Sequence, residues 1–145
     1  MKVLIVDDEE LIGALFKEYL DGYAECEVVY DGKQAIKSFK QAHKSGSPFD
    51  LICMDIMMPQ LSGRETLQVI RDLESDMGLE GLDKVKVIMI SAKRDTETIM
   101  GSFFDEKCDA YLRKPIDQAE LIRTIDEIDV FNERKTSCID ASQSK

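Results

Sequence analysis

The 145-residue chain lacks several features that whole classes of protein require. No apolar run approaches the roughly 20 residues that are needed to cross a bilayer. The N-terminal apolar run, residues 3–6, is interrupted by two aspartates and is not followed by a small-residue cleavage site, so it is too short for a secretory signal. We therefore expect no membrane contact and a cytoplasmic location.

Basic residues, histidine and paired cysteines are also scarce. Lysine and arginine number 19 against 29 acidic residues, which gives a formal net charge of −10. Nucleic-acid phosphates demand clustered basic side chains, so we expect no direct nucleic-acid binding by this domain. His43 is the only histidine, which argues against a His-rich metal site and against self-contained histidine catalysis. The four cysteines form no C-x-x-C pair, and we expect reduced thiols.

What the chain does contain is five short apolar runs that alternate with five stretches of helical periodicity. The apolar runs, which we expect to be strands, are residues 3–6, 26–30, 51–54, 85–90 and 110–112. The helical stretches centre on residues 11–20, 35–39, 67–73, 99–103 and 121–128. The capping-box spacing, an Asp or Ser three residues before Glu or Gln, occurs at Asp31, Ser62 and Asp117.

Alternating strands and helices predict an α/β protein. The expected architecture is a flavodoxin-like (βα)5 three-layer sandwich around a five-stranded parallel sheet of order 2-1-3-4-5. We assign residues 1–131 to this domain. Residues 132–145 are mostly polar, and we interpret them as a C-terminal tail or the start of a linker.

Three acidic residues come directly after neighbouring strands of the predicted sheet. Asp7 and Asp8 follow the first strand, and Asp55 follows the third. Ligands of such sheets bind outside the carboxyl ends of the strands, so these carboxylates should converge there. Their repulsion is costly unless a cation binds, and oxygen ligands that leave room for water suit Mg²⁺. A single aspartate at such a position is more often a helix cap or a turn residue, but three at adjacent strand ends favour a metal site.

A hydroxyl and an ammonium group complete the set. Ser91 ends the fourth strand, and Lys114 follows the fifth, next to Pro115. Lysine supplies a point charge for phosphate oxygens, and the serine hydroxyl can donate a hydrogen bond to them. Each would be an ordinary loop or turn residue alone, but beside the acids they favour phosphoryl transfer, in which catalysis is mainly positioning and charge neutralisation. The charges of the three carboxylates, Mg²⁺ and Lys114 sum to zero. Without the metal the site would carry a net negative charge, which a phosphoryl group would increase, so we expect the metal to be obligatory.

Four short motifs lie at the ends of these strands. They are Val-Leu-Ile-Val-Asp-Asp-Glu at residues 3–9, Leu-Ile-Cys-Met-Asp-Ile-Met-Met-Pro at 51–59, Ser-Ala at 91–92 and Tyr-Leu-Arg-Lys-Pro at 111–115. In this order and spacing they resemble the receiver domain of two-component response regulators. Any one motif alone would be a weak signal, and the four together are a strong one.

The resemblance implies that Asp55 accepts a phosphoryl group from the phosphohistidine of a histidine kinase or a phosphotransfer protein, with Lys114 assisting. It implies Mg²⁺ bound by Asp7 or Asp8, by Asp55 and by the backbone carbonyl of Met57. Such a domain is not an enzyme in the usual sense, since it catalyses only its own phosphorylation and dephosphorylation.

Ser91 and Tyr111 match the family's switch pair. Its rearrangement is implied to report phosphorylation to the face formed by the fourth helix, the fifth strand and the fifth helix. That face would bind a downstream protein target or an output domain, and a phosphorylation-dependent homodimer is left open. The resemblance, together with the need to aim Lys114 inward, also predicts a cis bond between Lys114 and Pro115.

Two other functions are open at this point. A pseudo-receiver uses the same fold only to dock partners, but it normally loses an acid, the lysine or the acceptor, and this chain keeps all of them. A phosphohydrolase with an aspartate nucleophile carries a second Asp two residues after the first, where Met57 stands. No G-x-G-x-x-G or G-x-x-x-x-G-K-[ST] pattern supports nucleotide binding.

The chain departs from the family pattern at two positions that matter here. Ser91 stands where threonine is the commoner residue. Residues 74–84 are longer and more polar than this connection usually is, so we expect local contacts there that are specific to this chain.

Overall fold

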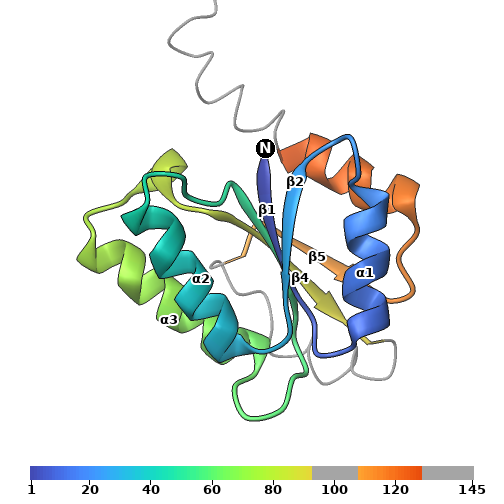
Figure 1. Cartoon of the computed structure of the whole chain (residues 1–145), viewed down its shortest axis with the longest axis horizontal. Coiled ribbons are helices and arrows are strands. Elements are labelled where there is room, and N and C mark those ends of the chain that lie inside the picture. Colours follow the sequence, from blue (N-terminus) through green and yellow to red (C-terminus); the bar gives the residue numbers. More distant parts are fainter. Residues whose placement is uncertain (93–107, 129–145) are drawn as a thin grey trace, which may run out of the picture.

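The computed structural model of the chain describes residues 1–92 and 108–128. Five parallel strands form one sheet in the order β2-β1-β3-β4-β5, as the sequence predicts (Figure 1). The strands are β1 (Lys2–Val6), β2 (Glu25–Val29), β3 (Leu51–Asp55), β4 (Lys86–Ser91) and β5 (Ala110–Arg113). The helices of the described residues are α1 (Glu10–Tyr19), α2 (Gly32–Lys44), α3 (Gly63–Asp76), the short 3-10 helix η1 (Gly81–Asp83) and a helix over residues 118–128. The helix expected around residues 99–103 and the tail 132–145 lie outside the described residues.

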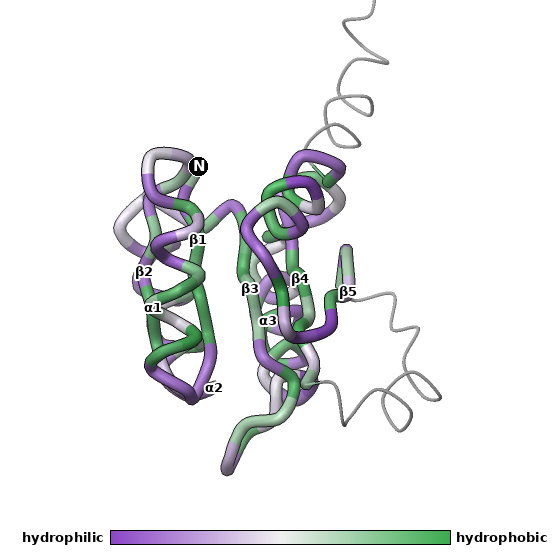
Figure 2. The backbone as a smooth tube through the Cα atoms, turned by 90° about the vertical axis from the view of Figure 1, so that its right-hand side faces the viewer, coloured by the Kyte–Doolittle hydropathy of each residue, from purple (hydrophilic) through white to green (hydrophobic). Residues whose placement is uncertain are grey.

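Helices cover both faces of the sheet. Figure 1 shows α2 and α3 on one face, and α1 and the helix of residues 118–128 on the other. Successive strand residues point to opposite faces, so each face has its own apolar core, and the central strands are apolar except at their ends (Figure 2). Toward α2 and α3 the strands contribute Leu4, Val6, Ile52, Met54, Val87 and Met89. Toward α1 and residues 118–128 they contribute Val3, Ile5, Leu51, Cys53, Ile88 and Ile90.

Side-chain caps mark the start of three helices, at the three positions that the sequence predicts. Ser62 and Glu65 form a complete capping box at the start of α3, because each side chain accepts a hydrogen bond from the other's backbone N–H. Asp31 accepts from the N–H of Gln34 at 2.8 Å, and Asp117 accepts from that of Glu120 at 2.7 Å. Each cap contributes about 1 kcal/mol and satisfies a backbone donor that the helix leaves unpaired.

The strand register brings the carboxyl ends of β1, β3 and β4 together. Val6 pairs with Met54, so the residues that follow them, Asp7 and Asp55, are neighbours. Asp55 in turn pairs with Ile90, the residue before Ser91. The three cysteines of the described ranges are free thiols, as expected. None of the described helices is long and apolar enough to cross a membrane.

Candidate functional site

The predicted acidic cluster forms at the carboxyl edge of the sheet. Asp7, Asp8 and Asp55 each offer a carboxylate oxygen, and the three oxygens lie within 4.8 Å of one another. Asp7 and Asp55 are buried, with 1% and 4% of their surfaces exposed, while Asp8 is exposed. The cluster therefore has a buried floor and one carboxylate that faces solvent.

The loop between β3 and α3 holds Asp55 in place through close backbone contacts. The N–H of Ile56 donates to the carbonyl of Ile90 at 2.8 Å, which ties the end of β3 to β4. The N–H of Gly63, the first residue of α3, donates to the carbonyl of Ile56 at 2.8 Å. A Cβ atom on Gly63 would lie 2.3 Å from the carbonyl oxygen of Asp55, so the start of α3 approaches this closely only because residue 63 has no side chain.

Lys114 reaches the acidic cluster from the end of β5, across the end of β4. Its ammonium nitrogen lies 3.0 Å from Asp7 Oδ2 and 3.7 Å from Asp55 Oδ2. The backbone N–H of Lys114 donates to the carbonyl of Ser91 at 2.8 Å, which continues the β4–β5 ladder by one residue. The Lys114–Pro115 bond is cis, which confirms that prediction.

The electrostatics of the site follow from burial and proximity. Burial, and after it the charge of Asp7, raise the pKa of Asp55 from 3.8 to about 7, although Lys114 opposes both effects. Burial likewise raises the pKa of Asp7, although hydrogen bonds from Glu9 and Lys114 lower it. For Lys114, burial lowers the pKa, but its hydrogen bond to Asp7 and the nearby acids outweigh burial, so the pKa is raised. The single ammonium group of Lys114 therefore does not neutralise all the carboxylates of the cluster.

The two predicted switch residues occupy different environments. Ser91 is fully buried at 0% exposure, and its hydroxyl has no hydrogen-bond partner within the described part of the chain. Burying a hydroxyl without a hydrogen-bond partner costs free energy, so the Ser91 hydroxyl is available to donate to a group that binds beside it. Tyr111 is half-buried and packs against the core on the side of α2 and α3.

Glu9 also contacts the site, although the sequence analysis did not single it out. It precedes α1, but its side chain makes no cap hydrogen bond. Its carboxylate instead lies 3.7 Å from the ammonium nitrogen of Lys114, on the exposed rim of the site. Its position directly after two other acids at the end of β1 is the only sequence feature that indicated this contact. Met57 lies in the loop two residues beyond Asp55 with its side chain exposed.

The donor set fits a hard divalent cation. All three converging groups are carboxylates, the oxygen ligands that Mg²⁺ prefers, and the exposed Asp8 leaves a side open to water. Burial is the main cause of the raised pKa values of Asp7 and Asp55, and Lys114 offsets it only in part, so a bound cation would favour the ionised carboxylates.

Comparison with known proteins identifies related chains along almost the whole length. The family model described as the response regulator receiver domain matches residues 3–126. The polar-differentiation response regulator DivK from Brucella ovis is 34% identical over 125 residues, which cover 85% of this chain and 91% of DivK. Several other curated relatives are much longer, and the chain spans only 7% to 49% of their length.

Solved structures show the same fold. The response regulator TrrA from Thermotoga maritima, in complex with Mg²⁺-BeF, is 26% identical with a TM-score of 0.68, covering 88% of this chain and 97% of TrrA. The receiver domain of Ssk1 from Saccharomyces cerevisiae was solved with the histidine phosphotransfer signalling protein Ypd1. That match is 25% identical with a TM-score of 0.72 and covers 86% of each chain.

Proposed function

We propose that this chain, which belongs to the response regulator receiver domain family of two-component systems, accepts a phosphoryl group on Asp55. The observation that carries the proposal is the convergence of Asp7, Asp8 and Asp55 beside the ammonium group of Lys114. Receiver domains are signalling domains that bind Mg²⁺ at an acidic pocket, and this chain has such a pocket.

The side chains have distinct tasks in this reaction. A carboxylate oxygen of Asp55 attacks the phosphorus atom of the donor, and the bond from phosphorus to the histidine nitrogen breaks, with its electron pair staying on nitrogen. Lys114, 3.7 Å from Asp55, faces the charge that develops on the phosphoryl oxygens. The hydroxyl of Ser91 donates a hydrogen bond to one of those oxygens and so gains the partner that it lacks among the described residues.

We assign the cation site to Asp7, Asp8, Asp55 and the backbone carbonyl of Met57. When bound, Mg²⁺ supplies positive charge that offsets the repulsion among the carboxylates and the charge of the phosphoryl oxygens. Burial and the charge of Asp7 disfavour the ionised form of Asp55 in the cation-free protein, so positive charge at this site also favours the nucleophilic carboxylate.

The phosphodonor is a histidine kinase or a phosphotransfer protein, the partner classes with which receiver domains interact. Ypd1, in its complex with the Ssk1 receiver domain, is a phosphotransfer protein of this kind. On this chain, α1 starts directly beside the site and exposes Leu11 at 85% and Leu15 at 37%. Two exposed leucines one helical turn apart, at the rim of the site, suit an apolar contact with such a partner. Downstream, the β5 side of the domain would bind a protein target or an output domain.

A direct test uses acetyl phosphate as a small phosphodonor. With Mg²⁺ present, we expect one phosphoryl group per chain by intact-protein mass spectrometry, and none in Asp55→Asn. Asp50→Asn is the matched control, because Asp50 is an exposed aspartate at the opposite end of β3 and should leave the label unchanged. A label that persists in Asp55→Asn would refute the assignment, and complete absence of label in the wild type would favour the pseudo-receiver alternative.

A further inference from the structure

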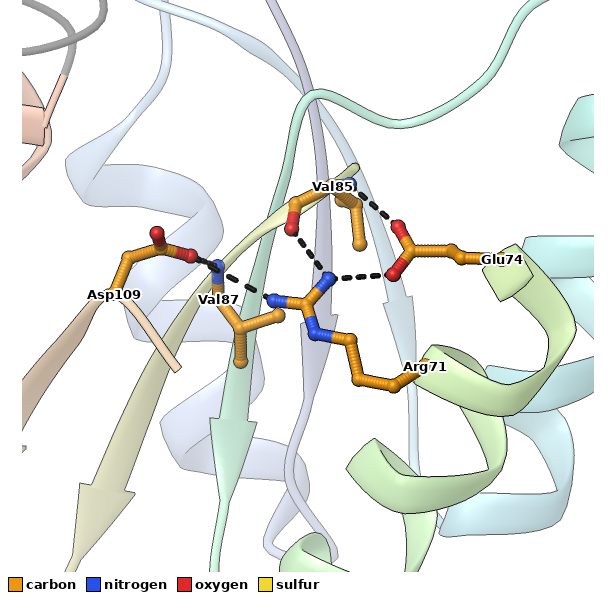
Figure 3. Close-up of polar contacts among 5 residues, drawn as sticks. All are labelled: Arg71, Glu74, Val85, Val87 and Asp109. Carbon is orange, nitrogen blue, oxygen red and sulfur yellow. Dashed lines mark hydrogen bonds and ion pairs between the residues drawn. The ribbon is translucent and has the colours of Figure 1, made fainter. Parts of the chain in front are cut away.

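An ionic network with one buried member lies at the amino ends of β4 and β5, at the opposite end of these strands from the acidic cluster (Figure 3). Glu74 of α3 is fully buried, and its carboxylate lies 2.6 Å from the guanidinium of Arg71. The same guanidinium lies 3.7 Å from the carboxylate of Asp109, the residue before β5. We call Arg71, Glu74 and Asp109 the edge clamp. None of the three takes part in the phosphoryl chemistry proposed above.

The edge clamp bonds to the backbone of β4 and of Val85, the residue just before it. The N–H of Val85 donates to Glu74 at 2.7 Å, and the carbonyl of Val85 accepts from Arg71 at 2.9 Å. Two residues on, the N–H of Val87 donates to the Asp109 carboxylate at 2.9 Å, and the carbonyl of Val87 accepts from the Asp109 N–H at 2.8 Å. Residues two apart in a strand direct these groups to the same edge, so side chains extend the ladder where β5 has not yet begun.

β5 is a short strand with one strand partner among the described residues. It has four residues, lies at the edge of the five-stranded sheet and pairs with β4. A slip by one residue would move it by about 3.3 Å and turn each side chain to the opposite face. Asp109 holds both the donor and the acceptor of Val87, so such a slip would break two hydrogen bonds at once. The strand that is fixed in this way carries Tyr111 and leads directly to Lys114.

We propose that Arg71, Glu74 and Asp109 are positioning residues for the phosphorylation site, because they set the register of β5 and thereby hold Lys114 within reach of Asp7 and Asp55. The proposal rests on the proposed function. Stability alone is a weak reason for these charges, since replacing a buried ion pair by apolar residues is often neutral or stabilising. Asp109 instead contacts both the N–H and the carbonyl of Val87, and Arg71, which Glu74 holds in place, orients Asp109. These contacts act on the position of β5.

The acids and Lys114 come from different strands, so a positioning role can be distinguished from a general loss of stability. Asp55 lies in β3, and Asp7 and Asp8 directly follow β1; in the sheet, β4 separates these two strands from β5. Lys114 alone depends on β5. Loosening the edge clamp should therefore spare Mg²⁺ binding and impair the step that needs Lys114.

The principal variant is Asp109→Ala, which removes the contacts to Val87 N–H and Arg71. The Asp109 side chain is 34% exposed, so its loss should leave the chain folded. Asp109→Asn keeps an oxygen for Val87 N–H, and Arg71→Lys keeps the charge beside buried Glu74 but loses the guanidinium fork. Ala42→Gly on α2 is the control, because it costs about 1 kcal/mol of helix propensity at a residue that forms no part of the edge clamp.

Three measurements on the full chain decide the matter: Mg²⁺ affinity by calorimetry, the acetyl phosphate reaction rate at saturating Mg²⁺, and amide hydrogen exchange. In Asp109→Ala and Arg71→Lys we expect Mg²⁺ affinity to stay within about twofold, because a misplaced Lys114 affects catalysis rather than the acids, and the rate to fall about tenfold or more. Exchange of the β5 and Lys114 amides should quicken about tenfold while that of β1 and β3 does not. Asp109→Asn should retain more activity than Asp109→Ala, and Ala42→Gly should match the wild type.

Contrary results fall into two separate kinds. If the Asp109 and Arg71 variants react as fast as Ala42→Gly, or lose Mg²⁺ affinity in parallel with rate, the positioning role is wrong while the proposed function stands. If the wild type itself takes no phosphoryl group, the proposed function fails, and the positioning role fails with it whatever the exchange data show.

Discussion

Asp55 is a buried acid next to a second buried acid, and this combination makes its protonation state depend on folding. Burial first, and then the charge of Asp7, raise the pKa of Asp55 from 3.8 to about 7. The folded, cation-free protein therefore holds the Asp55 proton to a higher pH than the unfolded chain does. Because the folded state binds more protons in this window, its free energy of unfolding falls as pH rises from about 4 to about 7.

Replacing Asp55 by asparagine should remove this cost. In a chelating buffer at pH 7.5 we expect Asp55→Asn to exceed the wild type in free energy of unfolding by about 2–4 kcal/mol, and the difference to shrink as pH approaches 4. Added Mg²⁺ should raise the stability of the wild type and narrow the gap. Urea unfolding followed by circular dichroism measures both. Asp76→Asn, at an exposed aspartate of α3, is the control. A stability difference that does not depend on pH would contradict the assignment.

Single residues also show where prediction from sequence stopped. Asp7, Asp8, Asp55, Ser91 and Lys114 could be predicted to converge, because each follows a strand and parallel strands end at one edge. The contact of Glu9 with Lys114 was missed, because it depends on how far a flexible side chain reaches across the site rather than on a strand end. The raised pKa of Asp55 likewise depends on burial, which spacing along the chain does not reveal.

At the scale of secondary-structure elements, local signals located the five strands and the starts of the three capped helices. The caps at Asp31, Ser62 and Asp117 use contacts within a few residues, so they are visible in sequence. The edge clamp is not, because it joins residues of α3, β4 and the start of β5 that only the folded sheet brings together. The polar stretch at residues 74–84 indicated chain-specific contacts but not which residues would form them.

The close approach of α3 to β3 predicts a specific effect of Gly63→Ala. Its Cβ would meet the carbonyl of Asp55 at 2.3 Å and the Cα of Ile56 at 2.9 Å, so the start of α3 and the end of β3 must separate. We expect a loss of about 1–3 kcal/mol in free energy of unfolding, as for other overpacked sites. Because Asp55 moves with that backbone, Mg²⁺ affinity measured by calorimetry should also fall.

Gly78→Ala provides the matched control for this loss. Gly78 follows α3 at φ 78°, where alanine is strained, yet no atom lies within 4 Å of its added Cβ. It should lower stability to a similar degree without changing Mg²⁺ affinity. If both variants bind Mg²⁺ like the wild type, then close packing at residue 63 does not position Asp55.

At the scale of the whole molecule, β4 and β5 connect two ends with different properties. The carboxyl end combines acids, an ammonium group and a buried hydroxyl that has no partner among the described residues. At the amino end, the edge clamp residues form hydrogen bonds with one another and with the backbone of Val85 and Val87. The edge clamp anchors the amino ends of β4 and β5, while Lys114 alone does not neutralise the carboxylates at the other end. We therefore expect the structural response to phosphorylation to occur at the carboxyl end. Packed interiors favour discrete alternatives, so a phosphoryl group there can select between two arrangements of Ser91 and Tyr111.

Cutting that coupling at Ser91 should separate phosphorylation from its consequence. A phosphoryl dianion is a strong acceptor, so the Ser91 hydroxyl should turn toward it, and half-buried Tyr111 on the adjacent strand can repack in response. A ligand shifts such an equilibrium only through contacts that differ between the two states, and this hydroxyl supplies one. With Mg²⁺ and beryllofluoride as the phosphate mimic, we expect amide shift changes in β5 and residues 118–128 of the wild type. In Ser91→Ala the mimic should still bind, with the changes confined to the acidic cluster. Ser38→Ala, which removes a hydroxyl on α2 that bonds to Glu27, should respond like the wild type. Equal changes in Ser91→Ala and the wild type would mean that the signal leaves the site by another route.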